Sequence, residues 1–317
     1  MGKIKIFRDI LKIAFLSVIF ALPINPTYAE VKPQIFSSNE MSMHKLKDLS
    51  FKSIMREFYE GKMGNLFLSD DEFLKGKPYV GYLESDGSMS NGIALLYPII
   101  EYYNSKNEKR YLAIIQKSRV DEIQGEKDLY FGSFDSQGSA DLYLFKKENE
   151  AYELVSRNNP KNIITNKHSD SNYSLIDSNE FGGDFGQIGF NPEDLKKNIT
   201  KLGADLQGSF VFEHANNHGY GTEILKVIQL NENNFISIHN FGVYEQEDGT
   251  KPENSPLGFH YKGEYKVIDN GNQYFPIEIK FTGDMPSEDG SKIVNAERTE
   301  IYNFNPIKNE YEKKLTN

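Results

Sequence analysis

The chain of 317 residues contains no cysteine and no tryptophan. The absence of cysteine excludes disulfide bridges, thiolate nucleophiles and cysteine-based zinc sites. Basic residues are also scarce, with 36 against 46 acidic residues, which gives a formal net charge of −10. A protein that binds nucleic acid needs a basic face to neutralise phosphates, so we expect no nucleic-acid partner.

Apolar residues are present in the proportion of a folded protein. The chain is 38% hydrophobic and 13% aromatic, with 19 tyrosines and 22 phenylalanines. A disordered chain lacks the aromatic residues that bury a core, and neither a glycine period nor sustained heptads occur. Disordered, collagen-like and coiled-coil classes are therefore excluded.

Residues 1–29 have the layout of a secretory signal peptide. Four basic residues precede an apolar run from Ile13 to Leu22, and Thr27-Tyr28-Ala29 places small residues at the −3 and −1 positions of a cleavage site. The run is shorter than the roughly 18 apolar residues that a membrane-spanning helix needs, and no later stretch reaches that length. We expect an exported protein, periplasmic or secreted, without a membrane span after cleavage; the alternative is an uncleaved N-terminal anchor.

We predict cleavage after Ala29, which leaves a mature chain that begins at Glu30. The first 29 residues hold four basic residues and one acid, so cleavage shifts the net charge from −10 to −13. The intact mass of the protein recovered from the periplasm checks this prediction, and a mass that retains Met1 contradicts it.

The mature sequence indicates a mainly β fold. Apolar periodicity predicts a helix over 44–62, and Asn191-Pro192 is a good start for a short second helix at about 192–199. Short segments rich in β-branched and aromatic residues, separated by turn residues, predict antiparallel sheets in a sandwich, barrel or propeller-like arrangement. The predicted strands are 79–84, 93–103, 111–117, 128–134, 140–147, 151–156, 208–214, 222–230, 234–240, 259–268, 274–281 and 299–304.

Two segments share a pattern. YLFKKENEAY at 143–152 and YNFNPIKNEY at 302–311 both place Phe two residues after Tyr and a second Tyr seven residues later. This is either a duplicated hairpin that closes two related β units or a coincidence. The first interpretation gives an N-terminal helix and β unit at 30–157, a polar, Gly-rich connection at 158–207 and a second β unit at 208–317, which together form one or two domains.

The chain resembles exported proteins of Gram-negative bacteria that have no assigned function. The resemblance covers most of residues 90–317. It is carried by YLAIIQK at 111–117, DLYLF at 141–145, Ile188-Gly189 after a Gly-rich stretch, and HGYGTE at 218–223. It implies export and no particular activity.

The densest polar cluster is FEHANNHGYGTE at 212–223. Two histidines four residues apart on a helix can bind zinc, but Asn216, Asn217 and Gly219 favour a turn, so we predict an exposed hairpin loop. Glycines allow close backbone approach, so the loop is a candidate ligand-binding site. A shared site with His239 and His260 is a further hypothesis. The candidate ligand-binding residues are His214, His218, Tyr220 and Glu223.

DSQGSAD at 135–141 is a candidate calcium loop. Hard cations prefer oxygen ligands, and Asp135 and Asp141 can supply them around the turn at Gly138. The intermediate positions hold Ser136, Gln137 and Ser139 instead of acids, so a plain β-turn is the alternative.

No nucleophile elbow G-x-S-x-G and no phosphate-binding GxxxxGK[ST] occur in the sequence. We therefore expect a binding protein that recognises a protein or a cell-envelope polymer through loops on a β scaffold. An inhibitor or immunity protein against a basic toxin is a variant of this hypothesis. The alternative is a metal-assisted hydrolase that uses His214, His218 and Glu223 with zinc.

Overall fold

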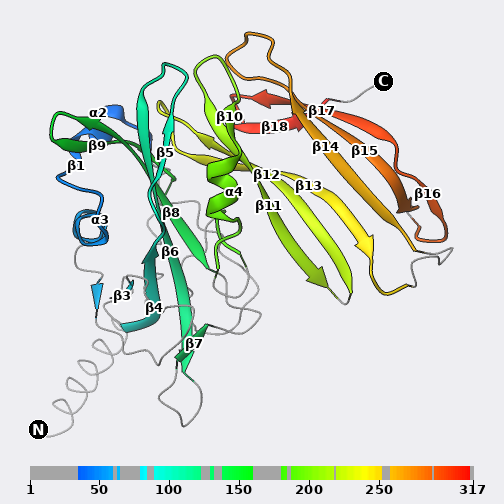
Figure 1. Cartoon of the computed structure of the whole chain (residues 1–317), viewed down its shortest axis with the longest axis horizontal. Coiled ribbons are helices and arrows are strands. Elements are labelled where there is room, and N and C mark those ends of the chain that lie inside the picture. Colours follow the sequence, from blue (N-terminus) through cyan, green and yellow to red (C-terminus); the bar gives the residue numbers. More distant parts are fainter. Residues whose placement is uncertain are drawn as a thin grey trace, which may run out of the picture. The chain divides into compact units, whose positions relative to one another are not determined.

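The computed structural model confirms a mainly β fold built from antiparallel strands (Figure 1). Both sheets belong to one compact unit, Ile35–Asn317. Among the described residues, no helix is long and apolar enough to cross a membrane. The structure describes residues 35–59, 63–64, 79–83, 89–122, 129–131, 138–159, 180–183, 187–217, 219–251, 258–287 and 289–314.

The helix predicted over 44–62 begins later than expected. Two short helices occur in this region, α2 at Ser38–Met43 and α3 at Phe51–Phe58. Ser50 stays extended as the N-cap of α3, and its hydroxyl accepts from the backbone N–H of Ser53 at 3.3 Å. Asp48 accepts from the backbone N–H of Ser50 at 3.0 Å. The prediction was wrong over 44–50. The hydrogen bonds of Asp48 and Ser50 begin the helix at Phe51, and the preceding residues Lys45–Leu46 form strand β1 instead.

The second predicted helix is confirmed, and its cap is the one that the sequence indicated. Helix α4 spans Pro192–Lys197, and Asn191 accepts from the backbone N–H of Glu193 at 2.9 Å. Proline suits the first turn because its missing N–H would have no partner there. Leu195 is fully buried, and its carbonyl accepts from the Ser209 hydroxyl at 2.7 Å, which fixes α4 on β11.

Among the described residues each of the two sheets has nine strands, and the first is ordered β1-β9-β8-β6-β4-β3-β2, with β5 and β7 paired to β6. Its long central strands, β6 and β8, pair antiparallel from Tyr111↔Phe145 to Lys117↔Ser139. The strands are β1 Lys45–Leu46, β2 Met63–Gly64, β3 Tyr79–Leu83, β4 Met89–Leu96, β5 Ile100–Tyr103, β6 Lys109–Glu122, β7 Leu129–Phe131, β8 Ser139–Glu148 and β9 Ala151–Arg157.

The second sheet also has nine strands, ordered β10-β11-β12-β13-β14-β15-β17-β18, with β16 paired to β15. Two register shifts between β12 and β13 bend this sheet at Phe241 and Tyr244. The strands are β10 Ile199–Lys201, β11 Gln207–Asn217, β12 Tyr220–Leu230, β13 Ser237–Asp248, β14 His260–Val267, β15 Ile277–Pro286, β16 Ile293–Asn295, β17 Arg298–Asn305 and β18 Glu310–Lys313.

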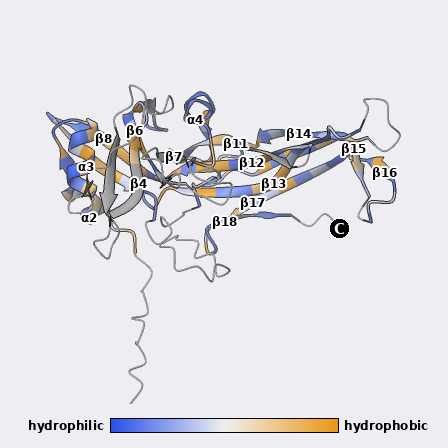
Figure 2. Cartoon of the chain, turned by 90° about the horizontal axis from the view of Figure 1, so that it is seen from below, coloured by the Kyte–Doolittle hydropathy of each residue, from blue (hydrophilic) through white to orange (hydrophobic). Residues whose placement is uncertain are grey.

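Alternating side chains divide the buried residues among three cores. Leu112 and Ile114 of β6 share one core with Val211 and Ile228 of the second sheet. The intervening Ala113 and Ile115 point to the other face of the first sheet, which α3 covers with Ile54 and Met55. The third core lies within the second sheet, where Phe210 stacks on Tyr265 at a centroid distance of 4.0 Å. Figure 2 shows the hydrophobic and hydrophilic residues interspersed along β11, β12 and β13.

The β12–β13 turn joins the two sheets. The backbone N–H of Ile236 donates to the carbonyl of Arg157 at 2.9 Å, and the Ser156 hydroxyl donates to the carbonyl of Asn234 at 2.6 Å. Phe235 packs edge-on against Phe36 at a centroid distance of 5.3 Å. These contacts fix the turn against the first sheet, and they place its first residues beside β6.

The two hairpins with the shared Tyr-Phe pattern both form, but their strands pair differently. Asn149 and Asn309 each adopt a φ of 55°, a conformation that asparagine tolerates well in tight turns. Tyr152 lies opposite Lys147 in the first hairpin, whereas Tyr311 lies opposite Phe304 in the second. The sequence likeness therefore does not extend to the strand register, and duplication of a whole β unit stays a prediction.

Candidate functional site

The polar segment 212–223 forms a hairpin and not a helix, as predicted. Strands β11 and β12 pair from Gln207↔Leu230 to Asn217↔Tyr220, so Asn216 and Asn217, which were expected in the turn, belong to β11. Gly219 in that turn has a φ of 90°, which disfavours residues with a Cβ atom. His218 lies outside the described residues.

The described side chains of this hairpin form an exposed polar surface. His214 Nδ1 lies 3.1 Å from Glu223 Oε1 across the strand pair, and the His214 side chain is 66% exposed. Tyr220 is 36% exposed and stacks on Phe259 with a centroid distance of 6.2 Å. Contacts between exposed charges contribute little stability, so these residues are available to a partner without disturbing the core.

The described histidines do not form a shared site. His260 Nε2 lies 2.8 Å from Glu245 Oε1, at the exposed surface. His239 is buried on β13, where it contacts Ser237 and the rings of Phe304 and Tyr311. Among the described ranges, no group of three or more histidine, aspartate or glutamate side chains is arranged to hold a metal ion. The zinc-dependent hydrolase therefore stays a prediction that no described contact supports.

The candidate calcium ligand Asp141 has partners within the protein. Its carboxylate accepts a hydrogen bond from the Tyr59 hydroxyl and forms an ion pair with Lys117 Nζ at 3.1 Å. Burial and the neighbouring Asp141 charge both raise the pKa of Tyr59 well above its usual value, so Tyr59 remains a donor. Asp135 lies outside the described residues, and the calcium site stays a prediction.

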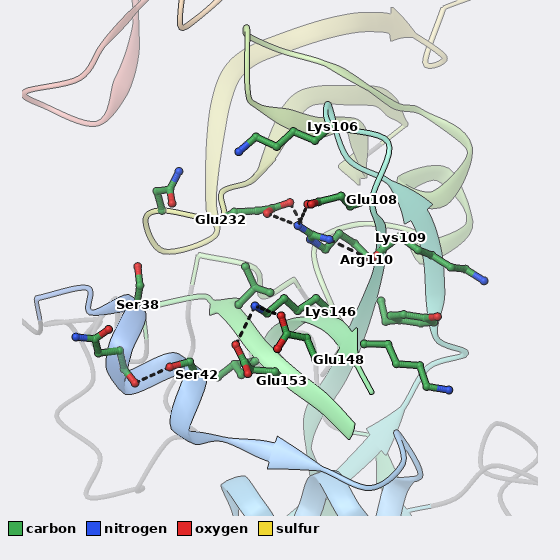
Figure 3. Close-up of a pocket in the computed structure, with 16 residues that line it drawn as sticks. Ser38, Ser42, Lys106, Glu108, Lys109, Arg110, Lys146, Glu148, Glu153 and Glu232 are labelled. Atoms are coloured by element: carbon green, nitrogen blue, oxygen red, sulfur yellow. Dashed lines mark hydrogen bonds and ion pairs between the residues drawn. The ribbon is translucent and has the colours of Figure 1, made fainter. Parts of the chain in front are cut away.

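A charged cleft that the sequence did not predict lies beside the β12–β13 turn. Its volume is about 670 Å³, and four segments of the chain form its walls. These segments are α2, the β5–β6 hairpin, the β8–β9 hairpin and the β12–β13 turn (Figure 3). The lining residues are Ser38, Asn39, Ser42, Lys106, Glu108, Lys109, Arg110, Tyr111, Lys146, Lys147, Glu148, Glu153, Leu154, Val155, Glu232 and Asn233.

Arg110 organises one side of this charged cleft. Its side chain is only 6% exposed, and its Nε and Nη2 donate to the two carboxylate oxygens of Glu232 at 3.0 and 2.7 Å. Nη2 also donates to Glu108 at 2.7 Å. The guanidinium holds the pKa of the Glu108 carboxyl below its usual value by donating this hydrogen bond. Asn104 donates to both carboxylates, so the network is fixed before any ligand arrives.

Lys146 organises the opposite side. Its ammonium lies 2.9 Å from Glu148 and 3.0 Å from Glu153, whose side chain is 9% exposed. Lys45 contacts the second oxygen of Glu153 at 3.0 Å. Burial pushes the pKa of Glu153 upward, but hydrogen bonds from Lys45 and Lys146 outweigh burial and hold it below its usual value. Glu153 is therefore a carboxylate at neutral pH.

Sequence reasoning missed this cleft because its parts are far apart in the chain. Arg110 and Glu232 are separated by 122 residues, and no short motif connects them. The one local signal is an arginine placed between Lys109 and Tyr111 at the start of an apolar strand, where a charged residue needs a partner. No protein-family model, curated protein or solved structure matches this chain.

Proposed function

We propose that the chain is an exported binding protein, periplasmic or secreted, that recognises a polar ligand in the charged cleft. The convergence of four distant segments on one cleft of about 670 Å³ carries this proposal. Ligand sites in proteins are concave, few and commonly about 300–1,000 Å³ in volume. The signal-peptide layout of residues 1–29 supports export. A component of the cell envelope is the ligand source that fits both features.

The cleft is built to bind without large rearrangement. The Arg110 network fixes the position of Glu232, and hydrogen bonds to the backbone hold the β12–β13 turn that carries it. Binding groups that are already ordered lose little conformational entropy when a ligand binds, so the free energy of binding is not reduced by the cost of ordering them. This preorganisation supports recognition.

A single bulky side chain on α2 tests the proposal. Ser38 lines the cleft from an exposed position, so Ser38→Trp should fill the entrance at a stability cost within about 0.5 kcal/mol. Glu40→Trp is the matched control, because Glu40 is exposed on the same helix and does not line the cleft. Amide NMR spectra of the mature chain are recorded during titration with the low-molecular-mass fraction of a periplasmic extract and with solubilised cell-envelope polymer.

We expect signals of Lys106, Ser42 and Asn233 to shift in the wild type and in Glu40→Trp, and to stay fixed in Ser38→Trp. Shifts confined to His214 and Tyr220 would instead identify the β11–β12 hairpin as the recognition surface. That result would contradict the cleft proposal while keeping the chain a binding protein. The inhibitor or immunity variant predicts binding of a basic protein at that surface.

A further inference from the structure

The carboxylates that line the cleft are already matched to cations. The lining residues include five basic and four acidic side chains. Arg110 pairs with Glu108 and Glu232, and Lys146 pairs with Glu148 and Glu153, so each of the four carboxylates has a cationic partner. Lys106 and Lys147 lie outside these pairs. An ionic ligand that bonded to a member of the Arg110 or Lys146 network would have to separate an existing pair. Breaking a pair in this way is costly when one member is buried.

Spare hydrogen-bonding capacity remains in the same pairs. The Lys146 ammonium has three N–H donors, and two of them serve Glu148 and Glu153. Each Glu153 oxygen accepts from one lysine and keeps a further lone pair. A hydroxyl group both donates and accepts, so it can bridge a carboxylate and an ammonium without breaking the ion pair. Several adjacent hydroxyls would therefore satisfy this lining better than a charged group.

The remaining lining residues include neutral polar side chains and an aromatic ring, which also suit a ligand with hydroxyl groups. Ser38, Ser42 and Asn233 contribute neutral polar groups from α2 and from the β12–β13 turn. Tyr111 contributes an aromatic ring, which Tyr152 contacts edge-on at a centroid distance of 5.0 Å and over which Lys109 Nζ lies 5.4 Å from the centroid. Aromatic rings offer a flat apolar surface at little entropic cost. Such a surface suits the C–H face of a sugar ring.

We infer that the charged cleft takes a neutral polyhydroxylated ligand, a saccharide, with the Arg110 and Lys146 ion pairs bonding to its hydroxyl groups. This inference rests on the proposed function, since it names the chemical class of the ligand of that cleft. The saccharide source that agrees with export is a glycan of the cell envelope. Figure 3 shows the two ion-pair networks and the α2 serines around the cleft.

The test compares neutral and charged probes on the mature chain. Maltohexaose and the hexamer of N-acetylglucosamine are the neutral probes, and citrate and spermidine are the charged ones. Binding is followed by amide NMR at about 50 mM and about 500 mM NaCl, because salt screens ionic binding and leaves hydroxyl contacts nearly unchanged. We expect a neutral hexasaccharide to shift cleft signals with a Kd that changes less than about two-fold with salt. Ser38→Trp should weaken it at least about ten-fold, and Glu40→Trp should leave it unchanged.

Two results overturn the inference and leave the proposed function standing. One is binding of citrate or spermidine alone in the cleft, with a Kd that weakens about ten-fold or more at high salt. The other is a shift of cleft signals by envelope extract but by none of the neutral probes. Absence of any cleft shift with every probe and every extract overturns both the inference and the proposed function.

Discussion

Replacing Arg110 with alanine is expected to lower the free energy of unfolding by about 3 kcal/mol, because the change leaves Glu232 without its guanidinium partner. The Arg110 side chain is 6% exposed and Glu232 is 23% exposed, so water replaces the lost contacts only in part. Loss of the Arg110–Glu232 ion pair should also make the β12–β13 turn more mobile, because Glu232 lies near the start of that turn. Urea unfolding at neutral pH, followed by circular dichroism, measures the effect.

Lys109→Ala is the matched control. Lys109 precedes Arg110 on β6, and its ammonium pairs with Glu101 at 2.6 Å. The Lys109 side chain is 42% exposed, so its removal should cost about 1 kcal/mol at most. If Arg110→Ala costs no more than Lys109→Ala, the Arg110 network does not hold the turn, and the preorganisation argued for the cleft is wrong.

A double-mutant cycle separates the ion pair from the rest of the turn. Glu232→Gln removes the charge and keeps the size, so the combined Arg110→Ala and Glu232→Gln variant should recover part of the single loss. A coupling energy near zero would show that other contacts fix the turn. The backbone bond from Ile236 to Arg157 and the Ser156 hydroxyl bond to Asn234 are the contacts that would then carry it.

Local patterns predicted most of the β structure. A segment rich in apolar and aromatic residues that ends at turn residues identified β8, which was expected at 140–147 and spans Ser139–Glu148. Asn216, Asn217 and Gly219 indicated the 212–223 hairpin, although Asn216 and Asn217 lie in β11 and not in its turn. Strands β10, β16 and β18 were missed, because segments of three or four residues carry too few positions to show a period.

Tertiary relations could not be predicted in this way. His214, expected in an exposed loop, lies instead on strand β11 opposite Glu223, and its side chain is 66% exposed. The cleft was missed, because its Arg110–Glu232 pair depends on how the β12–β13 turn packs against the first sheet. The burial of His239 was missed for a similar reason. The rings of Phe304 on β17 and Tyr311 on β18 cover it, and no local pattern predicts that packing.

Stability is expected to fall by about 3 kcal/mol between pH 6.5 and pH 4 through His239 alone. Burial lowers the pKa of His239 from 6.5 to about 4, since the charged imidazolium would lie between Phe304 and Tyr311. The unfolded chain therefore binds the proton first as the pH falls. The contribution of neutral His239 is complete above pH 6.5, is lost progressively down to pH 4, and changes no further below that.

His239→Gln tests this expectation, because glutamine does not titrate and its amide can still bond to Ser237, which lies 3.1 Å from His239 Nε2. Urea unfolding at pH 7 and pH 5 should show the wild type losing about 2 kcal/mol more than the variant, a range above the titration of most carboxylates. His214→Gln is the control for the substitution itself. The His214 side chain is 66% exposed, so the same change there should alter the free energy of unfolding at pH 7 by less than about 0.5 kcal/mol. If His239→Gln and the wild type lose stability in parallel, protonation does not penalise the fold at β13, and water or a carboxylate must reach the imidazole.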